Sequence, residues 1–283
     1  MKRVAMRVAV MVIAMSGISL RGMAQSTPAA QSAPSGQAAA PAAAPAGKRK
    51  PMAKTQPEYD AWKVAAAMTD AAAQEKAAAD FATKYPDSEL RQLLYTAVMH
   101  TYQAANNSDK TVEAAQKVLA LDADDPEALV TVAQLLAERT RDTDLDKDQK
   151  LAEARKDAQR TLVTIDTDVP TAGYPPEQIN AFKGFIRSQA YYTLGTLDYN
   201  ASAWPAAEGN LRKSIDALPQ QVDPVTVFRL SVALDMQNKY PEALKYANQA
   251  VEMTKEGTNA GDAARKEKER LTELNKGGAP PAK

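Results

Sequence analysis

Apolar residues recur along most of the chain at the three- and four-residue spacing of amphipathic helices, not at the two-residue spacing of strands. The clearest case is the segment 188–219, in which Leu194 falls on one face of a first helix. Leu211 falls on the corresponding face of a second helix, after a short turn. Gly195 and Ala207 stand where the two helices would cross, and small residues there allow a close approach. The pattern therefore predicts a helical hairpin in this segment.

The hairpin pattern recurs along the chain at a nearly constant step. The step from Gln92 to Pro126 is 34 residues, and Lys239–Met253 repeats the second helix of the clearest hairpin 36 residues later. In the clearest unit the order is an aromatic residue, Leu-Gly, a second aromatic residue, then Ala, a large apolar residue and a terminal Pro. This order resembles the tetratricopeptide repeat (TPR). We count five such units, with insertions at 140–148 and 169–187.

The resemblance implies an all-α fold, a right-handed α-solenoid of TPR-like helix hairpins. The first helices of successive units would line its concave face. We also expect one long helix from about Pro176 to Ala201, because apolar residues continue at helical spacing through the second insertion. The charged segment 260–275 is expected to form a C-terminal capping helix that shields the last repeat.

The N-terminal residues predict export. Lys2, Arg3 and Arg7 precede an apolar run of 13 residues, the pattern of a secretory signal peptide. That run is too short to span a bilayer, which takes about 20 residues. We therefore expect a periplasmic or secreted protein with no transmembrane segment after cleavage near Ala24. The Ala/Pro-rich stretch that follows cannot bury enough apolar surface to order itself. The expected divisions are 1–24 (signal peptide), 25–57 (disordered linker), 58–276 (TPR-like helical repeat domain) and 277–283 (disordered tail).

Composition excludes several kinds of chemistry. The chain has no cysteine and a single histidine, His100, so disulfides, thiolate metal sites and multi-histidine metal sites are impossible. The 35 basic and 35 acidic residues balance, and removal of residues 1–24 leaves 31 basic against 35 acidic, a net charge of −4. That balance argues against binding to nucleic acid. Phosphate-binding loops and common hydrolase motifs are absent from the sequence, so we expect no enzyme and no cofactor.

Two charged segments leave alternatives open. The basic residues Lys48–Lys50 and Lys54 would help adhesion to an anionic membrane or wall polymer, or would simply be solvated linker. The loop Asp142–Asp148 alternates carboxylates as an EF-hand calcium loop does, but Lys147 stands where a Gly would make the sharp turn. We therefore expect a solvated acidic insertion without a specific calcium site.

The inward positions implied by the repeat register combine aromatic residues with Gln, Thr and Asn, and they include no Lys or Arg. TPR proteins that hold a peptide's C-terminal carboxylates use Lys, Arg and Asn at such positions, so that mode of binding is not expected. A face of this composition suits an extended peptide or a helix, held by stacking and by side-chain hydrogen bonds. The candidate protein-binding residues are Trp62, His100, Gln134, Tyr192, Tyr199, Asn200 and Phe228.

These expectations combine into one function. The sequence predicts an exported TPR scaffold or adaptor that mediates protein–protein interactions in the cell envelope, with protein partners bound on the concave face. The alternative is a cell-wall-associated or calcium-dependent structural protein.

Overall fold

The computed structural model describes residues 48–277. The expected signal peptide, residues 25–47 of the expected linker and residues 278–283 of the expected tail lie outside the described residues. Across residues 48–277 the regular structure is entirely helical, with eleven α-helices and one short 3-10 turn. The helices are α1 (Gln56–Ala66), α2 (Ala71–Lys84), α3 (Leu90–Ala104), α4 (Ser108–Leu121), α5 (Pro126–Arg139), α6 (Lys147–Thr164), α7 (Pro176–Asn200), α8 (Trp204–Ala217), α9 (Pro224–Asp235), α10 (Tyr240–Met253) and α11 (Asn259–Asn275).

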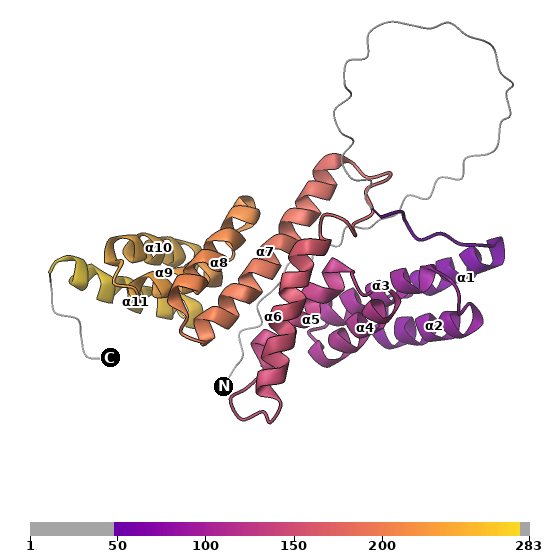
Figure 1. Cartoon of the computed structure of the whole chain (residues 1–283), viewed down its shortest axis with the longest axis horizontal. Helices are drawn as coiled ribbons and strands as arrows, with labels where there is room; N and C mark the ends of the chain where they lie inside the picture. The colour runs from indigo at the N-terminus through magenta and orange to yellow at the C-terminus, as the bar shows by residue number, and fades with distance from the viewer. Residues whose placement is uncertain (1–47, 278–283) are drawn as a thin grey trace, which may run out of the picture.

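The helices pack in successive hairpins. Helices α3 and α4, α5 and α6, α7 and α8, and α9 and α10 make the most extensive contacts, and each hairpin then packs on the next. Figure 1 shows α1 to α4 at one end of the molecule, α8 to α11 at the other, and the long α6 and α7 between them. The expected all-α solenoid of TPR-like hairpins is therefore confirmed. Helix α11 packs against α10 and α9, where the capping helix was expected.

The turns inside the hairpins share one backbone device. Asn106, Ser202 and Asn238 have φ values of 55°, 56° and 60°, and each stands in the short turn between the two helices of a hairpin. A single residue in the left-handed region reverses the chain within a very short turn. Asn adopts this conformation more easily than other residues with a side chain, whereas Ser carries a steric cost there. Three hairpins thus turn in the same way on different residues.

The links between hairpins are held by capping side chains. The Asp125 carboxylate accepts hydrogen bonds from the backbone N–H groups of Glu127 and Ala128, and Asp223 accepts from that of Thr226. These acceptors satisfy amide groups that have no partner inside their own helix. Acidic residues therefore gather at the edge of the molecule where one hairpin passes to the next.

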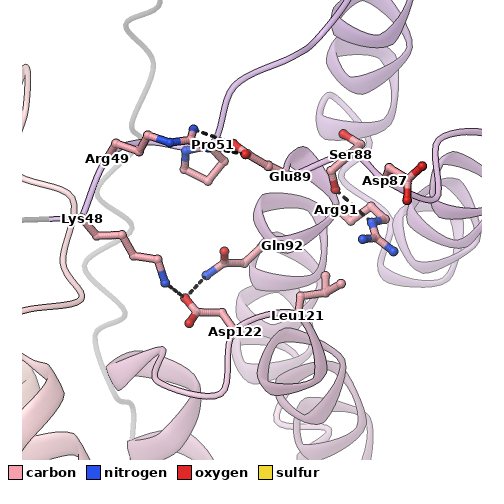
Figure 2. A pocket seen from close by; sticks show the side chains of 10 residues that line it. All are labelled: Lys48, Arg49, Pro51, Asp87, Ser88, Glu89, Arg91, Gln92, Leu121 and Asp122. Carbon is pink, nitrogen blue, oxygen red and sulfur yellow. Dashed lines mark hydrogen bonds and ion pairs between the residues drawn. The ribbon is translucent and has the colours of Figure 1, made fainter.

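The chain between Lys48 and the start of α1 runs in extended form past the links that precede α3 and α5. Figure 2 shows Arg49 beside Glu89 and Lys48 beside Asp122. Helix α1 begins two residues before the boundary that the sequence suggested, and the Thr55 hydroxyl caps it.

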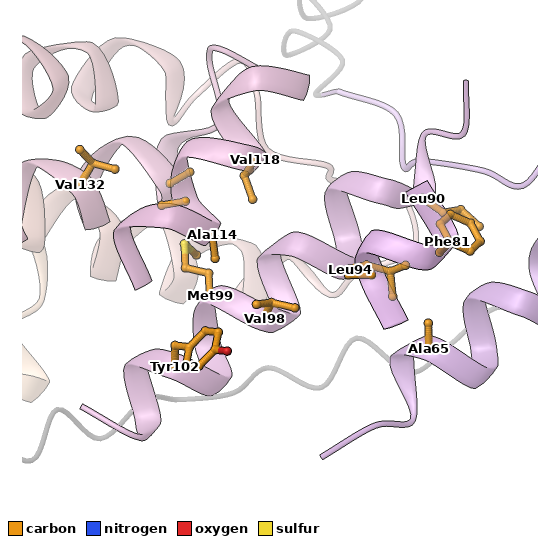
Figure 3. Close-up of a cluster of buried hydrophobic side chains, with 13 residues drawn as sticks. Ala65, Phe81, Leu90, Leu94, Val98, Met99, Tyr102, Ala114, Val118 and Val132 are labelled. Carbon is orange, nitrogen blue, oxygen red and sulfur yellow. The ribbon is translucent and has the colours of Figure 1, made fainter. Parts of the chain in front are cut away.

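The apolar core runs along the interfaces between helices. In the first part of the molecule Leu90, Leu94 and Met99 of α3 are buried against α2 and α4, and Figure 3 shows these side chains together. In the fourth hairpin the expected close crossing at Gly195 is confirmed. A Cβ atom added to Gly195 would lie 2.8 Å from Cδ2 of Leu211, so no side chain fits there without displacement.

Candidate functional site

All seven candidate binding residues lie on the first helices of hairpins, although they differ in how much of each side chain reaches the surface. Asn200 is exposed, Tyr192 is buried, and the other five are half-buried. Their positions are Trp62 on α1, His100 on α3, Gln134 on α5, Tyr192, Tyr199 and Asn200 on α7, and Phe228 on α9.

Arg229 joins α9 to α7 at the centre of this set. Its Nη1 donates to the Tyr192 hydroxyl at 2.8 Å and to Thr196 Oγ1 at 2.6 Å. Its guanidinium carbon lies 5.3 Å from the ring centroid of Tyr192 and 5.9 Å from that of Tyr199. Both distances allow cation–π attraction. The expectation of a face without Lys or Arg is therefore wrong at this point, because Arg229 follows Phe228 directly and its long side chain reaches across to α7.

The two tyrosines around Arg229 sit in a partly desolvated setting. Burial raises the pKa of Tyr192 and of Tyr199, and the positive charge of Arg229 offsets only part of that effect. Both phenols therefore stay protonated at neutral pH. Arg229 is half-buried, and it donates to the hydroxyl groups of Tyr192 and Thr196. The arrangement leaves a positive charge at the surface whose hydrogen bonds go to neutral hydroxyl groups.

Tyr199 and Phe228 serve partly as packing residues. The ring of Tyr199 meets that of Trp204 edge to face at 5.5 Å, beside the core formed by α8, α9 and α10. Phe228 packs against Val227, Ala250 and their neighbours. Removing either whole ring would therefore disturb the fold as well as the surface.

The candidates in the first three hairpins are less crowded together. His100 Nε2 lies 2.8 Å from Oε1 of Glu127 on the next first helix. Burial alone would lower the pKa of His100, but the charge and hydrogen bond of Glu127 outweigh it and raise the pKa. Gln134 Nε2 donates to the Glu138 carboxylate at 3.0 Å. Each of these groups thus has a neighbour on the same face.

Trp62 stands at the end of the row of first helices. Its ring stacks on that of Tyr59 with 5.7 Å between centroids. Its indole Nε1 is buried and has no hydrogen-bond partner among the described residues. A buried indole N–H without an acceptor lowers the stability of the fold at this end of the row.

Two buried aspartates near this face are committed to structural ion pairs. Asp198 on α7 accepts from Arg155 Nη2 at 2.7 Å and from Asn210 Nδ2 at 2.7 Å, which ties α6, α7 and α8 together. Asp235 on α9 pairs with Arg270 of α11. Long-range pairs of this kind carry no sequence signal, because the partners stand 35 to 43 residues apart.

The acidic loop between α5 and α6 turns its carboxylates toward lysines. Lys147 Nζ lies 2.7 Å from Asp142, and Lys150 Nζ lies 2.9 Å from Asp146. The hydrogen bond from Lys147 lowers the pKa of Asp142. Across residues 48–277 no three His, Cys, Asp or Glu side chains come together as a metal site would require. In the same part of the chain, none of the helices combines the length and the apolar character needed to cross a membrane.

Comparisons with known proteins give likenesses of fold only. No family model matches the sequence, and no curated protein matches it. The solved structure titled "Crystal structure of MamA protein" is 17% identical, with a TM-score of 0.47 over 69% of this chain and 88% of that one. A second, titled "Crystal Structure of P58(IPK) TPR Domain at 2.5 A", is 14% identical, with a TM-score of 0.28 over 78% of this chain and 65% of that one.

Proposed function

We propose that this protein is an exported scaffold or adaptor that binds a partner protein on the face formed by its first helices. A TPR-like solenoid offers an extended surface and little that could act as a catalytic site, so protein binding is the function that this architecture supports best. The cluster around Arg229 carries the proposal. It combines a half-buried arginine with the rings of Tyr192 and Tyr199. Arg and Tyr are among the residues enriched at the centre of protein interfaces.

The chemistry of the cluster around Arg229 limits which kinds of partner segment it could bind. Arg229 keeps N–H donors available beyond those given to Tyr192 and Thr196, since a guanidinium has five. Backbone carbonyls or an acidic side chain of an extended peptide or helix would accept them. We infer a partner segment that presents carbonyl or carboxylate oxygens to Arg229.

The structure offers no support to the alternative of a calcium-dependent structural protein. In the loop that prompted it, Asp142 and Asp146 face lysines. A cation there would have to displace Lys147 and Lys150 first.

Site-specific photo-crosslinking tests the proposal. A benzoylphenylalanine at Asn200, which is exposed beside the Arg229 cluster, should capture a partner in intact cells. The same group at Glu252, exposed on the second helix α10, is the matched control. Capture at Glu252 with none at Asn200 would refute binding on the first helices. Export is tested separately by N-terminal sequencing of the mature protein, which should begin near Gln25.

A further inference from the structure

The extended segment 48–52, here called the strap, is fastened to the repeats by an unusually complete set of contacts. Arg49 forms a two-pronged ion pair with Glu89, with one N–H···O distance of 2.7 Å. The backbone N–H of Met52 donates to the same carboxylate at 3.2 Å. A paired guanidinium and carboxylate is the most directional ion pair in proteins. The hydrogen bond from Arg49 also keeps the pKa of Glu89 below its ordinary value.

The strap contacts the repeats at three places, here called seats, and the first is the Glu89 carboxylate that binds Arg49. Lys48 occupies the second seat. Its ammonium group pairs with Asp122 and lies 3.8 Å from Asp168. The Asp122 carboxylate is also held by Gln92 Nε2 at 3.0 Å, so it is oriented before the lysine arrives. Its side chain is only 11% exposed, and a carboxylate so placed gains from a cation that shares its surroundings.

Lys50 occupies a third seat. Its Nζ lies 3.5 Å from the centroid of the Tyr174 ring, a direct cation–π contact. The neighbouring Gly173 has a φ of 78° and stands so near Lys50 Nζ that a Cβ atom would lie 3.3 Å from it. The backbone at Gly173 thus leaves room for the lysine end.

The three seats come from three different links between hairpins. Glu89 lies just before α3, Asp122 just before α5, and Asp168 and Tyr174 between α6 and α7. Together they form an acidic and aromatic row along one edge of the solenoid, away from the Arg229 cluster. A pocket of about 380 Å³ lies between the strap and this edge, as Figure 2 shows.

We propose that this edge is a second protein-binding site, specific for a short segment of consecutive Lys and Arg residues, and that the strap occupies it as an intramolecular competitor. The strap itself displays the matching chemistry, because three successive basic residues each meet a separate seat. A partner segment with the same run of cations would present the same groups at the same spacing. The site is independent of the proposed function of the Arg229 cluster.

The ion pairs that hold the strap are weak enough for a competing basic peptide to replace them. Arg49 is 67% exposed and Glu89 is 37% exposed, and ion pairs at such surfaces are individually weak and screened by salt. The strap nevertheless has a large advantage over a free peptide, because only three residues separate it from α1. A short tether of this kind gives an effective concentration in the millimolar range, roughly. A partner at lower concentration would bind only when the strap is released, or when the partner has a higher affinity for the site than the strap has.

Peptide binding to the full chain tests this. The probe is a fluorescein-labelled peptide of residues 48–53, KRKPMA, followed by fluorescence anisotropy at low salt. The strap variant carries Lys48→Ala, Arg49→Ala and Lys50→Ala. Relief of a competitor at an effective concentration of about 1 mM should tighten peptide binding over the parent chain, by about tenfold for a peptide that binds the strap variant with a Kd of about 0.1 mM. Circular dichroism should show unchanged helix content, since the strap precedes α1.

Seat substitutions make the test specific. Glu89→Gln with Asp122→Asn, added to the strap variant, should weaken peptide binding at least about fivefold, because two of the three charge pairs are lost. The matched control adds Asp142→Asn and Asp146→Asn, which remove the same charge from the exposed loop before α6, and should leave binding unchanged. A peptide with Glu in place of the three basic residues should not bind.

Three outcomes would overturn the proposal. Equal peptide binding by parent and strap variant would show that the strap does not compete. Equal effects of the seat and control substitutions would show that only overall charge matters. If the strap variant binds no peptide while the parent binds phosphatidylglycerol vesicles through Lys48–Lys50, the strap is an adhesion segment for anionic surfaces.

Discussion

Gly195 and Gly209 offer a matched pair for testing how tightly the solenoid is packed. Both lie inside helices of the same hairpin, α7 and α8. A Cβ on Gly195 would meet Leu211 at 2.8 Å from Cδ2, 2.9 Å from Cγ and 3.3 Å from the backbone nitrogen. A Cβ on Gly209 would meet nothing within 4 Å. The same change to Ala therefore has a steric consequence at one position and none at the other.

The expected magnitudes follow from two opposing terms. Ala is favoured over Gly inside a helix by about 1 kcal/mol. Gly209→Ala should gain this in full, since its Cβ enters solvent. At Gly195 the added methyl overfills the crossing, at a cost of roughly 1–3 kcal/mol. The clash reaches the backbone of α8, so rotation of Leu211 alone does not relieve it. Gly195→Ala should therefore destabilise the protein by as much as about 2 kcal/mol.

Thermal unfolding followed by circular dichroism measures both variants. In a chain of this size, 1 kcal/mol corresponds to about 2–4 °C in Tm. Gly209→Ala should raise Tm by that amount, and Gly195→Ala should lower it or leave it unchanged. A double variant with Leu211→Ala should show an interaction energy of at least about 0.5 kcal/mol, because part of the clash is then absent. Equal stabilisation by Ala at both glycines would refute the close crossing.

Other features give sharper single tests. Ser202→Gly should raise the unfolding free energy by about 0.5–1 kcal/mol, because Gly avoids the left-handed strain, whereas Ser202→Ala should give no gain in chemical denaturation. His100 has a raised pKa, so its pair with Glu127 stabilises the fold fully below pH about 6.5. That stabilisation is lost as pH rises through the pKa of His100 in the folded state, and Tm should fall over the same range. In His100→Gln this dependence of Tm on pH should be absent. Burial raises the pKa of Asp125 from 3.8 to about 6, so the fold loses stability as pH rises from about 3.8 to about 6. Asp125→Asn keeps the helix cap and should gain roughly 1–3 kcal/mol relative to the parent between pH 4 and pH 7, by urea titration. Arg229→Gln should weaken partner capture, and it should also lower Tm because the hydroxyl groups of Tyr192 and Thr196 lose their donor.

Each of these tests has an outcome that would count against it. Equal gains from Gly and Ala at position 202 would mean that the turn is unstrained. A pH slope that survives in His100→Gln would assign it to another group. A constant difference between Asp125→Asn and the parent from pH 4 to pH 7 would show that Asp125 is ionised normally in the fold. Unchanged capture by Arg229→Gln would remove the cation from the proposed interface.

The periodicity of apolar residues was sufficient to predict the fold, because helix packing depends on local spacing and on a few small residues. Gly195, Leu194 and Leu211 fall where the pattern placed them, and the long α7 extends almost to its expected limits. The repeat register defines positions relative to one helix, and the contact between Gly195 and Leu211 lies within one hairpin.

The functional surface was less predictable for a physical reason. A register assigns a direction to each Cα–Cβ bond, but a long side chain can leave that direction. Arg229 crosses from α9 to meet Tyr192, 37 residues earlier in the chain. Tyr192, expected on an open face, is consequently only 6% exposed. The contact of Lys48 with Asp122 joins residues that are 74 positions apart. Contacts of this kind cannot be predicted from the spacing of apolar residues along the chain.

The length of α7 has a mechanical consequence. In a solenoid, each unit touches only its neighbours, so bending is concentrated at the interfaces between units. The beginning of α7 packs through Ile186 against Ile165 at the end of the third hairpin, and its later turns pack through Leu194 and Leu197 against α5 and α6. Its opposite side carries α8 and the start of the last units. One continuous rod of 25 residues thus crosses a joint that would otherwise be a hinge. We therefore expect the molecule to bend less at this joint than at the interfaces between the shorter hairpins on either side.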